Sequence, residues 1–229
     1  MTRHVPAERL VLIPPGVSDE QAAAVMLKGL TAHYLLRRTY KVKKGDSIVV
    51  HAGAGGVGLL LVQWARALGA RVIATVGSDA KAAIAREHGA HEVVVIPRDD
   101  LVARVRELTA GKGVPVVYDS IGHDTFAASL DCLRRLGLMV SYGNSSGAVP
   151  AFSPLELSRR GSLYLTRPTL FDYTATKGEL HRAARELFQV VADGAMRIRV
   201  GQTYPLADAA RAHADLEARR TTGSTVLIP

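Results

Sequence analysis

The sequence predicts an α/β fold in which helices cover both faces of a parallel, doubly wound sheet. Three observations support this prediction. Short runs rich in valine and isoleucine alternate with amphipathic stretches through the middle of the chain. Several of the amphipathic stretches begin at an aspartate and close with a glycine, as helices commonly do. One short run also leads through a glycine-rich turn directly into a helix, the arrangement found in dinucleotide-binding sheets.

Five strands are expected in the central part of the chain, because each run is short and suited to burial on both faces. They are Ile48–His51, Arg71–Val76, Glu92–Ile96, Val114–Tyr118 and Leu138–Tyr142. The helices between them are expected over Val57–Leu68, Asp79–His88, Asp99–Thr109 and Asp124–Leu136. Three of these helices start with an aspartate as N-cap or first-turn residue. The glycines expected to end helices are Gly69, Gly89, Gly111 and Gly137.

The two ends of the chain have a different pattern. Residues 1–20 are rich in proline and predict an entry arm, followed by a helix or helix pair over Asp19–Arg38. A loop-like stretch after Gly143 precedes a strand candidate at Ser162–Thr166. The remaining expected elements are two helices, Lys177–Asp193 and Leu206–Glu217, a short strand near Arg197–Val200 and a terminal strand, Ser224–Ile228.

Composition excludes several classes of protein. No run approaches 18 consecutive apolar residues, so we expect no membrane span, and the N-terminus lacks the apolar region of a secretory signal. The single cysteine, Cys132, excludes an intramolecular disulfide and a cysteine-rich zinc site. We therefore expect a cytoplasmic protein. Its net charge of +8 is carried by scattered arginine pairs without interleaved aromatics, which argues against RNA binding and favours solvated helix faces plus a phosphate-binding site.

The glycine-rich turn, residues 53–58, has the G-x-G-x-x-G spacing of a dinucleotide-binding loop. Gly53 permits the tight reversal out of the first strand, and Gly55 lets the backbone approach a diphosphate. Gly58 lets the following helix pack closely. The diphosphate would then meet the free N–H groups and the positive end of that helix. A strand before the turn, a helix after it and a second strand on schedule favour this interpretation.

The end of the second strand indicates which dinucleotide is bound. NAD-preferring sites place a carboxylate there, whereas this strand ends at Val76 and continues into Gly77-Ser78. Ser78 can donate to a phosphate oxygen, and Lys81 follows in the first turn of the next helix. Asp79 would repel phosphate if it faced inward, but we expect it to cap its own helix. NADP(H) is therefore favoured over NAD(H).

Other candidates for chemistry are few. His51 is expected to be a packed residue rather than a base, and Cys132 a buried, inert thiol. No metal-ligand pattern, serine-hydrolase elbow or short-chain reductase pair is supported, so we predict no catalytic side chain and no metal site. Ligands of doubly wound sheets bind beyond the carboxyl ends of the strands. Three further segments should gather there: Asp119–Gly122, Tyr142–Ser146 and Thr166–Leu170.

Five motifs together resemble the NADPH:quinone oxidoreductases, zeta-crystallin-like and zinc-free members of the medium-chain dehydrogenase/reductase superfamily. The motifs are His51–Gly58, Lys28-Gly29-Leu30-Thr31, Val117-Tyr118-Asp119-Ser120, Gly143-Asn144-Ser145-Ser146-Gly147 and Leu165-Thr166-Arg167-Pro168. The resemblance covers essentially the whole chain. It implies hydride transfer from NADPH to a quinone or a related enone, without metal and without an obligatory protein acid.

The resemblance also implies roles for individual residues. Thr31 would lie near the nicotinamide, and Gly56 and Val57 would line the diphosphate. Gly77, Ser78 and Lys81 would hold the 2′-phosphate. The nicotinamide half would be bordered by Gly143, Asn144, Ser145 and Ser146 and by Pro168, Thr169 and Leu170, and Arg219 would reach the cofactor from the last helix.

Family members begin with a GroES-like domain that supplies the other wall of the quinone pocket, and the present chain would lack most of it. Residues 1–20 would be its remnant, 21–170 the dinucleotide-binding Rossmann domain, and 171–229 the C-terminal helices and strand that complete this domain and pack toward the missing one. Apolar surface on Leu10–Pro15 would be uncovered. A non-catalytic NADPH-binding fragment is therefore the alternative function. Homodimerisation through an edge strand near residues 162–166 is also implied.

Overall fold

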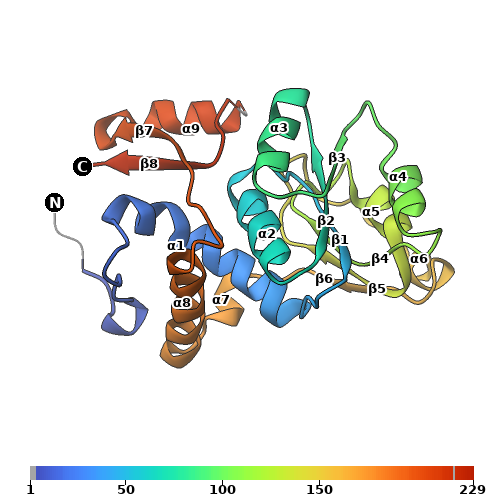
Figure 1. Cartoon of the computed structure of the whole chain (residues 1–229), viewed down its shortest axis with the longest axis horizontal. Helices are drawn as coiled ribbons and strands as arrows, with labels where there is room; N and C mark the ends of the chain where they lie inside the picture. Colours follow the sequence, from blue (N-terminus) through green and yellow to red (C-terminus); the bar gives the residue numbers. More distant parts are fainter. Residues whose placement is uncertain (1–3, 219) are drawn as a thin grey trace.

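The computed structural model describes residues 4–218 and 220–229 and contains one central sheet of six parallel strands (Figure 1). The strand order is β3-β2-β1-β4-β5-β6, so the chain winds outward in both directions from β1. The strands are β1 (Ser47–Val50), β2 (Arg71–Val76), β3 (Glu92–Val95), β4 (Val114–Asp119), β5 (Leu133–Ser141) and β6 (Tyr164–Thr166). The prediction of a doubly wound parallel sheet is confirmed.

Alternation of side chains along the strands divides the core into two layers. Ile48 and Val50 face one layer and Val49 the other. The first layer lies under α2 (Gly56–Ala67) and α3 (Asp79–Glu87), with α1 (Asp19–Tyr34) packed against α2 and α8 (Lys177–Ala192) packed against α1. The second lies under α4 (Leu101–Leu108) and α5 (Phe126–Cys132). Figure 1 shows the two sets of helices on opposite sides of the strands.

The helix starts are set by capping side chains that differ from those expected. Ser78, not Asp79, caps α3, because its hydroxyl accepts from the Lys81 N–H at 3.4 Å. Asp100 rather than Asp99 caps α4, since Asp99 instead accepts from the N–H of Val95 at the end of β3. The expected start at Asp124 is also wrong, because α5 begins at Phe126 after Thr125. These are shifts of one or two residues within correctly predicted helices.

The expected helix over Asp124–Leu136 is too long at its C-terminal end. The chain leaves the helix after Cys132, and Leu133 pairs with Val114 in the sheet. A bulge follows, in which Leu136 adopts a left-handed φ of 60°, before pairing resumes at Leu138. Gly137 therefore lies inside β5 and ends no helix. Gly69, Gly89 and Gly111 do follow helices with left-handed backbone, as predicted.

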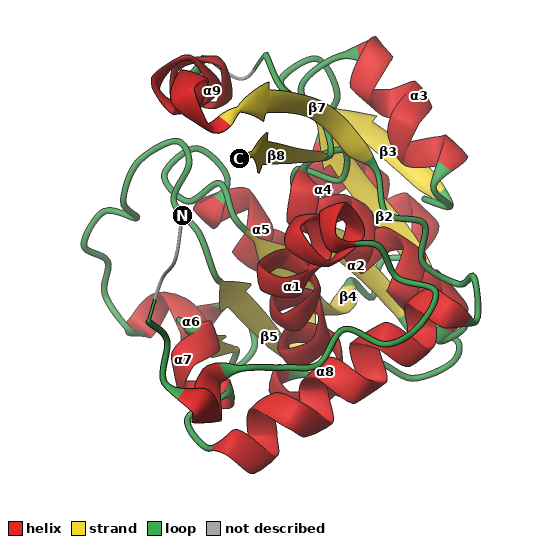
Figure 2. Cartoon of the chain, turned by 90° about the vertical axis from the view of Figure 1, so that its left-hand side faces the viewer, coloured by secondary structure: helices red, strands yellow, loops and turns green. Residues whose placement is uncertain are grey.

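The C-terminal part forms a second, two-stranded sheet. β7 (Val200–Pro205) and β8 (Ser224–Ile228) pair in parallel and are joined through a short turn, η3 (Leu206–Asp208), and α9 (Ala209–Glu217). The strand expected near Arg197–Val200 is wrong in position, because pairing begins at Val200. Figure 2 shows this unit beside α1, and the Ser224 hydroxyl donates to the Ala24 carbonyl at 2.9 Å. Smaller elements are η1 (Ala7–Arg9), a π-helical turn η2 (Leu35–Thr39), α6 (Leu155–Arg159) and α7 (Leu170–Tyr173).

Apolar side chains in the entry arm are uncovered, as predicted. Leu12 is 93% exposed, and Leu10 and Ile13 are exposed as well. Large apolar side chains on a surface mark a place where another surface can pack. Among the described residues, no helix combines the length and the apolar character needed to cross a bilayer.

Candidate functional site

The candidate site lies at the edge of the sheet where the parallel strands end. Because every neighbouring pair of strands is parallel, their carboxyl ends meet at the same edge. The segments that leave these ends are residues 51–55, 77–78, 96–100, 120–122, 142–146 and 167–170. The fold thus brings together the glycine loop and the three further segments predicted from the sequence.

Close contacts explain two of the glycines in the loop. The Gly53 N–H donates to the Thr75 carbonyl at 2.8 Å, and a Cβ on Gly53 would lie 2.6 Å from the Ala74 Cβ in the neighbouring strand. A Cβ on Gly58 would lie 2.1 Å from the Ala52 carbonyl oxygen, which is backbone and cannot turn aside. The loop and the start of α2 therefore fit together only when these positions carry no side chain.

The first turn of α2 suits a bound phosphate. Its N-cap is Gly55, which has no side chain to satisfy the exposed N–H groups, whereas Ser78 and Asp100 cap the next two helices. Gly56 and Val57 lie in this first turn, and backbone N–H groups at a helix N-terminus bind anions. The residues present therefore fit the diphosphate of a dinucleotide.

The region expected to hold a 2′-phosphate is open. Nothing lies within 4 Å of a Cβ built on Gly77, and Ser78 accepts a backbone bond while its own hydroxyl proton stays available. Asp79 points into solvent, where Arg98 Nη1 lies 3.0 Å from both of its carboxylate oxygens. The carboxylate of Asp79 therefore pairs with Arg98, whereas we expected it to accept from the backbone of its own helix. Sequence reasoning missed Arg98, although its place after β3 puts it beside the end of β2.

Two of the strand-end loops form one hydrogen-bonded surface. The N–H groups of Ser145 and Ser146 donate to the carbonyls of Ser120 and Ile121 at 3.1 and 2.9 Å. A Cβ on Gly143 would lie 2.7 Å from the Ser120 carbonyl oxygen, so the two loops approach as closely as backbones can. The Ser146 hydroxyl also donates to Ile121, and Asn144 is exposed. The loop after β5 is thus fixed by the loop after β4.

The remaining predicted residues lie on neighbouring elements. The Thr31 hydroxyl donates to the Leu27 carbonyl at 2.8 Å within α1. Pro168 is buried, and Thr169 is the exposed N-cap residue of α7, which begins at Leu170. Arg219 lies outside the described residues, so its predicted contact with the cofactor stays a prediction.

A buried polar network lies beneath the loops of the site and connects the ends of β1, β2 and β4 with α5. His51 is fully buried, with Nδ1 2.9 Å from the Thr75 hydroxyl and Nε2 2.9 Å from the Ser129 hydroxyl. Ser129 and Thr125 both donate to the carboxylate of buried Asp119. Burial lowers the pKa of His51 more than Asp119 raises it, which favours the neutral ring. His51 is a packed residue, as predicted.

Lys28 is a functional candidate to which sequence reasoning gave no role. It lies three residues before Thr31, on the same side of α1, and its side chain covers Gly56. A Cβ built on Gly56 would lie 2.8 Å from Cδ and Cε of Lys28 and 2.9 Å from Nζ. The spacing of the Lys28-Gly29-Leu30-Thr31 motif was the signal that could have identified it.

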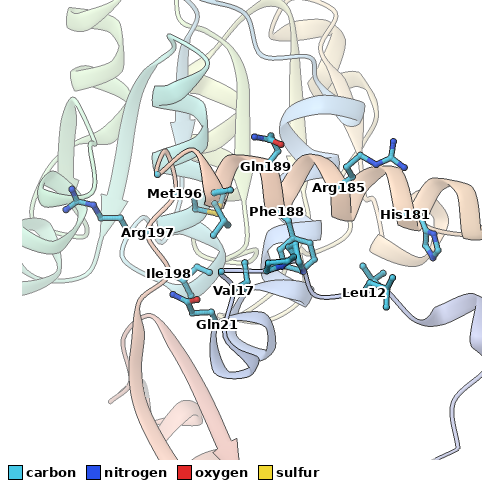
Figure 3. A pocket seen from close by; sticks show the side chains of 17 residues that line it. Leu12, Val17, Gln21, His181, Arg185, Phe188, Gln189, Met196, Arg197 and Ile198 are labelled. Carbon is cyan, nitrogen blue, oxygen red and sulfur yellow. The ribbon is translucent and has the colours of Figure 1, made fainter.

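The described residues contain no group of three or more His, Cys, Asp or Glu side chains arranged to hold a metal ion. Cys132 is buried as predicted, and burial raises the pKa of its thiol to about 12. A groove of about 900 Å³ lies away from the glycine loop, between the entry arm and α8 (Figure 3). It is lined by residues such as Leu12, Phe188 and Met196, and none of the predicted cofactor residues is among them.

Comparison with known proteins gives consistent matches. Residues 56–189 match the family model described as zinc-binding dehydrogenase. A quinone oxidoreductase of Pseudomonas aeruginosa is 55% identical over 99% of this chain and 70% of its own length. A 2-haloacrylate reductase of Burkholderia is 46% identical over 99% and 69%. The crystal structure of Escherichia coli quinone oxidoreductase complexed with NADPH is 52% identical, covers 97% of this chain and 69% of that protein, and superposes with a TM-score of 0.95.

Proposed function

The chain belongs to the quinone oxidoreductases of the zinc-binding dehydrogenase family, and on this premise we propose that it transfers hydride from NADPH to a quinone or a related enone. One observation carries the proposal. The chain is 52% identical, over 97% of its length, to an enzyme solved with NADPH, and it has the same backbone fold. The similar 2-haloacrylate reductase supports the inclusion of acceptors with a conjugated double bond.

In this proposal the protein binds and orients the reactants, and bound NADPH supplies the hydride. The first turn of α2 and the glycines of residues 53–58 hold the diphosphate. Gly77, Ser78 and Lys81 hold the 2′-phosphate. Thr31, residues 143–146 and residues 168–170 border the nicotinamide, with Arg219 as a further contact.

The proposal assigns no metal ion and no catalytic side chain to the reaction. The donor set of this chain supports that assignment, because its one cysteine is a buried thiol whose pKa is raised to about 12, and the described residues bring no three His, Cys, Asp or Glu side chains together as zinc ligands. The division into residues 1–20, 21–170 and 171–229 is retained as part of the proposal. A cytoplasmic location is also retained, and cell fractionation would test it.

The test is oxidation of NADPH by a simple quinone such as 1,4-benzoquinone. The reaction is monitored through the loss of NADPH absorbance. We expect quinone-dependent oxidation that is unchanged by a metal chelator. Tight NADPH binding without turnover would instead identify a non-catalytic NADPH-binding protein, the alternative named above. Absence of NADPH binding would contradict both functions.

Replacement of Lys81 by alanine should separate the two nicotinamide cofactors. We expect K81A to weaken NADPH binding about ten- to a hundredfold, because it removes a charge-assisted contact to the 2′-phosphate. NADH lacks that phosphate, so its affinity should change little. Fluorescence titration of both cofactors measures the difference, and equal weakening of the two would contradict the assignment of Lys81.

We also propose that the chain forms a homodimer through β6, the outer strand of the sheet. Tyr164 is 61% exposed and Leu165 is exposed as well, and an uncovered edge strand offers unpaired backbone groups to a second strand. Light scattering should give twice the chain mass of 24.5 kDa. We expect T166P to convert the dimer to monomers, because proline has no backbone N–H and disrupts pairing of the short strand β6. A monomeric native chain would contradict this proposal.

A further inference from the structure

The most informative unassigned side chain is Lys28, which lies between the first turn of α2 and the turn before β8. Its Nζ donates to the Gly223 carbonyl, but the distance is 3.5 Å, at the long end of a hydrogen bond. Its aliphatic stem lies over Gly56. Gly223 is held against α1 by the next residue, Ser224, whose hydroxyl binds the Ala24 carbonyl. The ammonium is therefore confined to a narrow space at the glycine loop.

The charges around Lys28 do not balance. Burial lowers the pKa of its ammonium, and no carboxylate among the described residues raises it again. The helix end that Lys28 faces is itself positive, equivalent to about half an elementary charge. A half-buried cation with one long hydrogen bond, set against the positive end of a helix, leaves an excess of positive charge at one point. An anion placed there would be attracted both by the Lys28 ammonium and by the N-terminal end of α2.

We infer that Lys28 is a further cofactor-binding residue, whose ammonium binds the diphosphate of NADPH together with the backbone N–H groups at the start of α2. The inference rests on the proposed function and extends it to a residue that neither the glycine motif nor the 2′-phosphate site includes. On binding, the ammonium exchanges its long bond to Gly223 for a short, charge-assisted bond to a phosphate oxygen. Thr31, proposed above to border the nicotinamide, lies one turn further along α1 on the same side of the helix.

A charge-removing substitution tests the inference. K28M keeps a long apolar side chain over Gly56 but removes the ammonium. We expect K28M to bind NADP⁺ about ten- to a hundredfold more weakly than the native chain, measured by calorimetry. Its affinity for adenosine 2′-monophosphate, which has the 2′-phosphate but no diphosphate, should stay unchanged. K81A, in contrast, should weaken both ligands.

The matched control is K41M, since Lys41 is an exposed lysine that precedes β1 at the opposite edge of the sheet. K41M removes the same charge and should leave both affinities unchanged. Equal NADP⁺ affinities of K28M and the native chain would overturn the inference while leaving the proposed function intact. If the native chain binds no NADP⁺, the proposed function fails and the inference fails with it.

A second measurement uses the native chain and does not depend on the folding of K28M. Reductive methylation of lysines, read by mass spectrometry, should modify Lys28 in the free protein, because a lowered pKa favours the reactive neutral amine. NADP⁺ at saturation should slow this modification at least tenfold, and adenosine 2′-monophosphate should not. Lys41 should react at the same rate throughout. Unchanged reactivity of Lys28 in the NADP⁺ complex would overturn the inference.

Discussion

Replacement of Gly58 by alanine is expected to abolish measurable NADPH binding and to lower the free energy of unfolding by about 3 kcal/mol. The added methyl group would lie 2.1 Å from the Ala52 carbonyl oxygen and 3.0 Å from the Gly53 Cα. Both atoms belong to the loop backbone, and Ala52 already adopts a left-handed φ of 51°. The start of α2 must therefore move away from the loop, which separates the diphosphate from the helix N–H groups.

Urea denaturation and NADPH titration of G58A check this expectation. The matched control is G178A, because Gly178 lies in the first turn of α8 and nothing lies within 4 Å of a Cβ built there. G178A should be neutral or slightly stabilising, since alanine is the better helix former. If G58A binds NADPH with native affinity, the loop does not hold the diphosphate as proposed.

Replacement of Asp119 by alanine is expected to lower the free energy of unfolding by about 4 kcal/mol. The carboxylate accepts from the N–H groups of Ile121 and Gly122 at 2.7 and 3.1 Å and from the hydroxyls of Thr125 and Ser129 at 2.8 and 2.9 Å. Those hydroxyls are buried, and a buried polar group without a partner costs about 1–3 kcal/mol. Loss of the carboxylate also releases the loop that fixes residues 143–146.

A graded series separates these effects. D119N retains the volume and one strong acceptor, so it should cost about half as much as D119A. S129A removes one donor to Asp119 together with the partner of His51 Nε2, and it should fall between them. Denaturation midpoints with unchanged slopes provide the comparison. A cost below about 1 kcal/mol for D119A would show that water replaces the carboxylate in this network.

The parts of the fold that depend on local pattern could be predicted from the sequence. Strand β1, the glycine loop and α2 are encoded within about twenty consecutive residues, from Ser47 to Ala67. Regular alternation of strands and helices then predicts a parallel, doubly wound sheet. The edge at which the predicted site residues meet can be predicted as soon as the strands are known to be parallel, because their carboxyl ends then lie together.

The rest depends on contacts between residues far apart in the chain. The amphipathic pattern continues past Cys132, yet pairing of Leu133 with Val114 ends the helix there. The charge on Asp79 is paired by Arg98, which comes from the end of a different strand. The spacing from Lys28 to Thr31 indicates that the two share a side of α1, but the contacts of Lys28 with Gly56 and Gly223 exist only in the complete fold.

The position of α1 has a consequence for the order in which the protein is made. Its buried side is covered by segments from the far end of the chain, since Gly29 fits against Leu187 and the Ala24 carbonyl accepts from Ser224. Ser224 follows the end of α1 by about 190 residues. A ribosome needs on the order of 10–40 s to add that length. Until α8 and then β8 have been made, part of the buried side of α1 has no cover, and we expect chaperones to bind the nascent chain there.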